Sequence, residues 1–291
     1  MRRSYFSLLV FIILSLIWSS TWLFIKLGLE TMPPFYAAAW RFLIAFLILY
    51  LYGRKKHLPI PQDIKSHLFF IVFGMSIFTV SYGLVYWGEQ YINSGLTSVL
   101  FSVMPFYTAL IALKILPDEK MNSHKLFGLL LGFAGIVIIF YDQLTFSTST
   151  IVLLAMGAIL LSPLFSAYGT LISKKAAHTY HPVTMNTLPL LYASISFFVL
   201  HFFLEKAPAS GISGMALISL FYLGIFGTAI AFVLYVWMLQ HTSALLMSSI
   251  TFVTPPMALM WGWVVLDEPV TINLALGMVL VFSGIYLVRK E

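Results

Sequence analysis

The chain contains no cysteine and very few charged residues. Without cysteine, a disulfide, a cysteine-ligated zinc site and an iron–sulfur cluster are all excluded. Only 9% of the 291 residues are charged and 60% are apolar, whereas a soluble domain carries about 25% charged residues. The apolar side chains must therefore face lipid or one another, which predicts an integral membrane protein with the lipid bilayer as a partner.

Recognisable catalytic motifs are also missing. The sequence has no phosphate-binding loop, no HExxH or GxSxG motif and no pair of carboxylates deep in an apolar run. The net charge of +6 does not indicate a nucleic-acid partner, because the basic residues lie in short segments between apolar runs. We expect neither an enzyme nor a metal site, a cofactor or a nucleic-acid partner.

Ten apolar runs approach the length of about 20 residues that a membrane-spanning helix needs. They cover residues 7–27, 35–52, 67–87, 95–116, 124–141, 150–172, 184–204, 214–238, 244–266 and 271–288. The first run is too long for the apolar region of a signal peptide and is followed by nine more, so we interpret it as a retained helix. The expected fold is an all-α integral membrane protein with ten transmembrane helices.

Lysine and arginine predict the orientation, because these residues prefer the cytoplasmic side of a membrane. With a cytoplasmic N-terminus, only Lys26, Arg41 and Lys206 lie toward the outside. Toward the inside lie Arg2, Arg3, Arg54, Lys55, Lys56, Lys65, Lys114, Lys120, Lys125, Lys174, Lys175, Arg289 and Lys290. Both termini are expected in the cytoplasm of a plasma or inner membrane protein, which requires an even number of spans.

The second half of the sequence repeats the first. The matched pairs are Lys26 with Lys174, Pro34 with Pro182, Trp87 with Trp237, Gln90 with Gln240, Pro105 with Pro255, Gly128 with Gly277 and Gly135 with Gly284, at offsets of 148 to 150. Five helices per half is an odd number, so the halves enter the membrane from opposite sides, as in many secondary transporters. We predict inverted-topology repeats at residues 1–145 and 146–291 of one membrane domain, with the glycines packing helices closely.

Prolines inside the spans are candidate hinges. A proline removes a backbone donor and frees a carbonyl one turn back, which in lipid needs a partner from protein or water. Each is either a static kink or a break beside a cavity. Because Pro105 and Pro255 occupy equivalent places, we predict a gating role for them and for Pro256.

Aromatic side chains and one arginine are the candidate binding residues. Aromatic residues near span ends fit the interfacial belts, but those deep in a span need a partner for their polar atom, which a cavity supplies. Arg41 lies farther inside its span than Lys26 and Glu89, which can snorkel to the interface. The predicted substrate-binding residues are Trp18, Trp22, Arg41, Tyr82, Tyr86 and Tyr168.

These features resemble the EamA-type branch of the drug/metabolite transporter superfamily. The resemblance rests on the Trp18–Trp22 stretch, Lys26, Pro33-Pro34, Arg41-Phe42, Pro105, Asp118-Glu119 and Gly128–Gly135, with Pro255, Asp267-Glu268-Pro269 and Gly277–Gly284 in the second half. It implies two five-helix repeats around a central cavity, in carriers that move amino acids, other metabolites or toxic organic compounds, often outward. One departure is that Ser166–Gly169 does not repeat the aromatic pair of the first helix, which predicts an asymmetric cavity.

The leading hypothesis is therefore a secondary transporter, most plausibly an exporter, of a small metabolite such as an amino acid. Alternating access would come from the third and fourth helices rocking against the eighth and ninth. A multidrug or organic-cation efflux carrier is the alternative, although an acidic residue at mid-span, which such carriers commonly use, is absent from the sequence. A membrane-embedded enzyme or scaffold is a third reading, and the oligomeric partner is left open.

Overall fold

The computed structural model describes residues 2–116, 121–139, 141, 149–206, 211–257 and 272–289, and the regular elements within these ranges are all helices. They are α1 (Arg2–Leu29), α2 (Pro34–Lys55), α3 (Ile64–Gly74), a π-helical segment (Met75–Ser81), α4 (Tyr82–Gly88), α5 (Ser94–Phe101), α6 (Met104–Ile115), α7 (Ser123–Ile139), α8 (Thr150–Ala176), α9 (Pro182–Leu204), α10 (Gly214–Gly224), a second π-helical segment (Ile225–Ile230), α11 (Ala231–Leu239), α12 (Ala244–Ser248) with a further helical stretch at 250–257, and α14 (Ile272–Arg289).

Seven of the expected spans are confirmed as helical segments that are long and apolar enough to cross a membrane. They are Tyr5–Leu29, Pro34–Lys55, Ile64–Gly88, Ser94–Ile115, Thr150–Ala176, Pro182–Leu204 and Gly214–Leu239. The other three expected spans contain the shorter apolar helices Ser123–Ile139, Ala244–Met257 and Ala275–Val288. The acidic pairs Asp118-Glu119 and Asp267-Glu268, with Pro269, lie outside the described residues.

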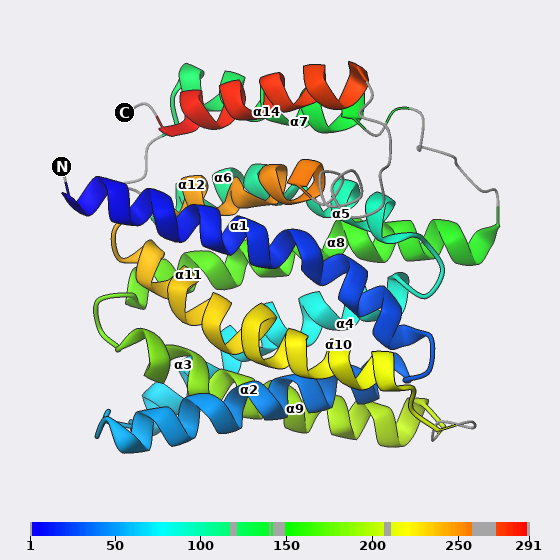
Figure 1. Ribbon diagram of the computed structural model, residues 1–291. Coiled ribbons are helices and arrows are strands. Elements are labelled where there is room, and N and C mark those ends of the chain that lie inside the picture. The colour runs from blue at the N-terminus through cyan, green and yellow to red at the C-terminus, as the bar shows by residue number, and fades with distance from the viewer. Residues whose placement is uncertain are drawn as a thin grey trace.

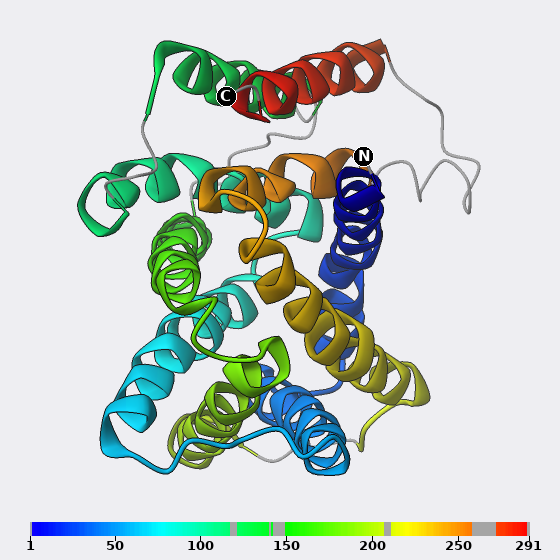
Figure 2. The same cartoon turned by 90° about the vertical axis from the view of Figure 1, so that its left-hand side faces the viewer.

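The helices lie roughly side by side, with their axes along one direction (Figure 1). α1 and α8, which stand at equivalent places in the two halves, run in opposite directions in this view. The beginning of α1 and the end of α14 lie at the same end of the bundle. α7 and α14 form a separate pair along one side, which both views show (Figures 1 and 2).

The outside of the bundle is apolar and its interior is rich in hydroxyl groups. Phe202 and Phe203 are 79% and 75% exposed, which suits contact with lipid. Buried hydroxyls such as those of Thr108 and Thr187 donate to carbonyl oxygens one turn back in their own helices. Because the hydrocarbon offers no hydrogen-bond partner, these internal bonds satisfy polar groups that water satisfies in a soluble protein.

Lys26, which is partly buried, is held by backbone oxygens at the end of α1. Its Nζ donates to the carbonyl oxygens of Glu89 at 2.6 Å and Ile92 at 3.2 Å, in the turn that follows α4. The last carbonyls of a helix lack partners within the helix and carry partial negative charge, so a cation there is stabilising. The snorkelling expected for Lys26 is therefore replaced by a tie between two helix ends.

The second half contains the same tie. Lys174 Nζ, at the end of α8, donates to the carbonyl oxygens of Leu239 at 2.7 Å and Thr242 at 2.8 Å, in the turn after α11. The donor Lys174 follows Lys26 by 148 residues, and the two acceptors follow Glu89 and Ile92 by 150 residues. The repeated sequence thus encodes a repeated contact.

Four glycines bring α7 and α14 into close contact. A Cβ on Gly128 would lie 2.6 Å from the backbone oxygen of Gly284, and a Cβ on Gly135 would lie 2.6 Å from that of Gly277. Gly128 near the start of α7 thus faces Gly284 late in α14, and Gly135 late in α7 faces Gly277 early in α14, as two antiparallel copies of one motif require. Only a residue without a side chain permits this approach, as expected for small residues in membrane helices.

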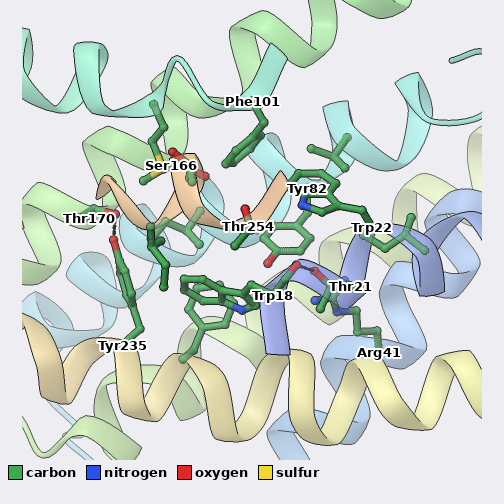
Figure 3. Close-up of a pocket in the computed structure, with 17 residues that line it drawn as sticks. Trp18, Thr21, Trp22, Arg41, Tyr82, Phe101, Ser166, Thr170, Tyr235 and Thr254 are labelled. Carbon is green, nitrogen blue, oxygen red and sulfur yellow. Dashed lines mark hydrogen bonds between the residues drawn. The ribbon is translucent and has the colours of Figure 1, made fainter. Parts of the chain in front are cut away.

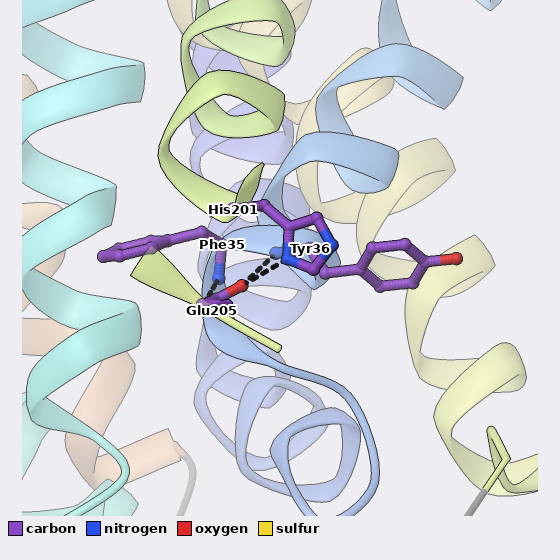
Figure 4. Close-up of polar contacts among 4 residues, drawn as sticks. All are labelled: Phe35, Tyr36, His201 and Glu205. Atoms are coloured by element: carbon purple, nitrogen blue, oxygen red, sulfur yellow. Dashed lines mark hydrogen bonds and ion pairs between the residues drawn. The ribbon is translucent and has the colours of Figure 1, made fainter. Parts of the chain in front are cut away.

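The beginning of α2 is capped by a carboxylate from the end of α9 (Figure 4). Glu205 Oε1 accepts a hydrogen bond from the Phe35 amide at 2.7 Å, and Oε2 accepts from the Tyr36 amide at 3.1 Å. Oε2 also lies 2.8 Å from His201 Nδ1. Free amides and the helix dipole make the N-terminus of a helix a favourable place for a negative charge. Glu205 therefore fastens α2 to its counterpart in the second half, α9.

We predict that Gly135→Ala destabilises the protein by about 1–3 kcal/mol, because its methyl group has to force α7 and α14 apart. Thermal unfolding in detergent measures this. Gly157→Ala is the matched control, because a Cβ at Gly157 meets no atom within 4 Å. Equal melting temperatures for both variants would contradict the packing role.

We predict that Glu205→Ala lowers stability by about 1–2 kcal/mol, because two amides of α2 lose their acceptor. Glu205→Gln retains an acceptor and is expected to lose less. The same unfolding measurement ranks the three proteins, and a Gln variant less stable than the Ala variant would contradict the capping role.

Candidate functional site

A cavity lies in the centre of the bundle, between helices of both halves (Figure 3). It offers about 90 Å³ of space to the centres of water molecules, whereas one water needs roughly 10–15 Å³ on this measure. The cavity is therefore large enough for several waters or for part of a small metabolite.

The walls of this cavity come from equivalent positions of the two repeats, with opposite chemistry. α1 supplies Trp18 and Trp22, and α8 supplies Ser166 and Thr170 at the offset of 148. At the offset of 150, the lining pairs are Tyr82 with Phe232, Val85 with Tyr235, Phe101 with Thr251 and Met104 with Thr254. The first half therefore contributes the larger indole rings, where the second half contributes hydroxyl groups.

The two kinds of wall lie at different ends of the cavity in Figure 3. Arg41 and Trp22 lie on one side of the view, and Thr170 and Tyr235 lie on the other, with Trp18 between them. A solute in this space would meet a cationic and aromatic environment at one end and a hydroxyl-rich environment at the other.

Arg41 lies on α2 and is only 1% exposed, yet it lines the cavity. Its Nε donates to Thr228 Oγ1 at 2.8 Å, Nη1 to Tyr86 Oη at 3.2 Å and Nη2 to the Gly227 oxygen at 3.4 Å. The guanidinium carbon also lies 4.8 Å from the centre of the Tyr82 ring, a favourable cation–π distance. These contacts fix the position of the charge and connect α2 to the second π-helical segment.

Of the other predicted binding residues, Trp18, Trp22 and Tyr82 line the cavity. Trp18 Nε1 donates to the Gly227 oxygen at 3.3 Å, which orients that ring. Tyr86 is 1% exposed and lies behind the wall, where its hydroxyl accepts from Arg41. Its place in the structure suits a residue that positions Arg41.

Tyr168 lies apart from the rest of the predicted set. Its side chain is 38% exposed and is not part of the lining, although its neighbours Ser166 and Thr170 are. Residues two apart on a helix point in different directions, so the face of α8 that reaches the cavity excludes Tyr168. The lining is asymmetric, as expected. The asymmetry arises because α8 has hydroxyl side chains at positions 166 and 170, where α1 has tryptophans.

Sequence reasoning missed this hydroxyl wall. Thr170 Oγ1 lies 2.9 Å from Tyr235 Oη, and Ser166 Oγ lies 2.7 Å from Ser81 Oγ. The signal that could have found it is the repeat offset itself, because adding 148 to Trp18 and Trp22 gives Ser166 and Thr170.

The two π-helical segments begin at equivalent positions, Met75 and Ile225, and each is connected with the cavity. Ile77 in the first segment lines the cavity, and Thr228 in the second holds Arg41. Thr228 Oγ1 also donates to the Leu223 oxygen, five residues back. Local π-helical turns in α-helices are frequent at functional sites.

The three candidate hinge prolines lie beside lining residues. Pro105 is buried in the first turn of α6, next to Met104, and follows the interruption between α5 and α6. Pro255 and Pro256 are buried in the 250–257 stretch, next to Thr254. Their gating role stays a prediction.

Glu89 is an ionisable side chain that the structure buries completely. It was expected to reach the interface, but it is 0% exposed. Among the described residues, neither carboxylate oxygen has a hydrogen-bond partner. Lys26 and Arg41 are the cations that act on it electrostatically.

Comparisons with known proteins agree with this arrangement. The sequence matches the EamA-like transporter family over residues 5–141 and again over 153–290. It is 30% identical over 279 residues to the uncharacterized transporter YoaV of Bacillus subtilis (strain 168), covering 94% of this chain and 93% of that protein. It is also 30% identical over 260 residues to the protein PagO of Salmonella typhimurium, covering 89% and 84% of the two chains. A solved crystal structure has the same fold, with a TM-score of 0.81 at 17% identity over 97% of this chain and 95% of that one.

The absence of native cysteine allows a direct test of the lining. We predict that Ser166→Cys reacts at least about tenfold faster than Tyr168→Cys with a small, charged thiol reagent, because the reacting thiolate needs water around it. Reaction rates in native membranes measure this. Faster labelling at position 168 would place Tyr168 in the water-filled cavity and contradict the assignment.

Proposed function

The chain belongs to the EamA-like transporter family, and is thus an integral membrane transporter of the drug/metabolite transporter superfamily; we propose that it exports a small metabolite, such as an amino acid, by alternating access. The observation that carries this proposal is the central cavity lined by both repeats. Transporters built from inverted repeats bind their substrates near the middle of the membrane, where the repeats meet.

Alternating access requires elements that change shape on both sides of the cavity. The π-helical segments in the third and eighth spans and the interruptions near Pro105 and at Ser249 are such elements. They occur in both halves and border the lining. We propose that the helices bearing them rock about Pro105, Pro255 and Pro256, so that the cavity opens to one side at a time.

We propose ten spans in two inverted repeats, residues 1–145 and 146–291, with both termini in the cytoplasm. The opposite directions of α1 and α8 support the inversion (Figure 1). The positions of the chain ends at one end of the bundle support an even number of spans. The excess of lysine and arginine in the segments at that end supports a cytoplasmic location.

Efflux of organic cations is the second candidate function, and the aromatic walls favour it through cation–π attraction. Arg41 opposes it, because a buried positive charge at the cavity repels a second one strongly in a medium of low polarity. We therefore place an uncharged, zwitterionic or anionic metabolite ahead of a cation.

Transport by purified protein in liposomes tests the proposal. We expect saturable flux of at least one solute from a pool of amino acids and central metabolites. Trp18→Ala should lower this flux at least about tenfold, because it removes a wall of the cavity, and Tyr168→Ala should change it less than about twofold. Absence of saturable flux, or equal effects of the two substitutions, would overturn the proposal.

A further inference from the structure

Arg41 carries a charge that the protein leaves without a paired carboxylate. Among the residues that the structure describes, no acidic oxygen lies within 4 Å of its guanidinium. Its three hydrogen-bond acceptors are two hydroxyl oxygens and one carbonyl oxygen, all of them neutral. The buried carboxyl group of Glu89 acts on Arg41 electrostatically, but it lies beyond 4 Å. A buried ion is costly unless an opposite charge compensates it, so an anion that contacts the guanidinium directly is stabilised there.

The guanidinium also has unused donors. It offers five N–H groups in a planar fork. Three of them donate to Thr228, Tyr86 and Gly227, and the guanidinium also interacts with the Tyr82 hydroxyl. Because Arg41 lines the cavity, a solute there can reach the remaining edge of the fork. Such a fork matches the two oxygens of a carboxylate, which form strong charge-assisted hydrogen bonds with it.

Lys26 provides the contrast within the same chain. Its Nζ is occupied by two carbonyl oxygens at a helix end, and it is not part of the cavity wall. The protein thus uses one cation to tie helices together, whereas the other stands at the space where a solute binds.

Among the described residues that line the cavity, Arg41 is the one that carries a charge. The position equivalent to Arg41 in the second half is Pro189, and the far end of the cavity is formed by Thr170 and Tyr235 (Figure 3). Between the two ends stand the rings of Trp18 and Phe101. This arrangement suits a small molecule with one negatively charged group and an apolar body.

We propose that Arg41 binds the carboxylate of the transported solute, so that the carrier selects small monocarboxylates, zwitterionic amino acids included, over their carboxamides. This inference rests on the proposed transport function and adds to it the chemical group that is recognised and the residue that recognises it.

Paired probes test the inference. Labelled amino acids and small aliphatic and aromatic monocarboxylates are offered to the reconstituted protein, and each transported acid is compared with its carboxamide. Loss of one charge-assisted interaction is expected to lower kcat/KM about 10- to 100-fold for the carboxamide. Flux of the carboxamide equal to that of the acid would overturn the inference and leave transport itself established.

Variants assign the selectivity to Arg41. Arg41→Gln should bring the acid-to-amide ratio close to one, and Arg41→Lys should keep a reduced preference for the acid because it retains the charge. Lys26→Gln is the control for loss of a partly buried cation outside the cavity wall, and its ratio should stay that of the unmodified protein. A ratio that survives Arg41→Gln would overturn the inference.

A binding measurement covers the case in which Arg41→Gln fails to fold. Thermal unfolding of the unmodified protein is recorded with each acid and with its carboxamide, since a bound solute stabilises the folded state. We expect stabilisation by the acid alone at equal concentration, and equal or greater stabilisation by the carboxamide overturns the inference. Absence of flux for every solute would instead overturn the proposed transport function.

Discussion

The hydrocarbon core of a bilayer offers no hydrogen bonds, so the protein has to satisfy its polar groups from within, and most of this structure follows from that constraint. Lys26 and Lys174 meet carbonyl oxygens at helix ends, and Glu205 meets the free amides of α2. Buried serine and threonine hydroxyls bond to their own helices. Against this background, the charge of Arg41, which has no carboxylate within 4 Å among the described residues, is the observation on which we base the proposal that a solute binds in the cavity.

Internal repetition explains the framework but not the cavity. The lysine ties, the π-helical segments and the glycine contacts of α7 with α14 occur at matched positions in both halves. At the cavity, matched positions carry unlike residues, tryptophans from α1 and hydroxyls from α8. A helix contact needs the same small or charged residue in both copies, whereas a cavity that fits an asymmetric solute needs different ones.

Sequence reasoning succeeded where a single physical rule decides the outcome. Apolar run length located seven of the spans, and glycine spacing predicted close packing of the fifth and tenth helices without showing that they pack on each other, because both depend on local composition. It failed where the rotation of a helix about its own axis decides which side chains reach the cavity and which are buried. Tyr168 is as deep in its span as a lining residue but points away from the cavity, and Glu89 lies near a span end but is buried by neighbouring helices. Depth along an axis can be read from a sequence; direction around that axis depends on packing partners.

Because the framework is repeated and the cavity lining is not, membership of the family does not identify the solute. Relatives near 30% identity share the framework, and a framework of inverted repeats supports alternation for many kinds of cargo. In our proposal the solute interacts with the few cavity-lining positions at which the two halves differ, above all Arg41, Trp18 and Thr170. A comparison between relatives therefore bears on cargo only at those positions. Relatives that share Lys26, Lys174 or the packing glycines are expected to share the way in which the helices pack in the membrane. These residues give no information about the solute that is transported.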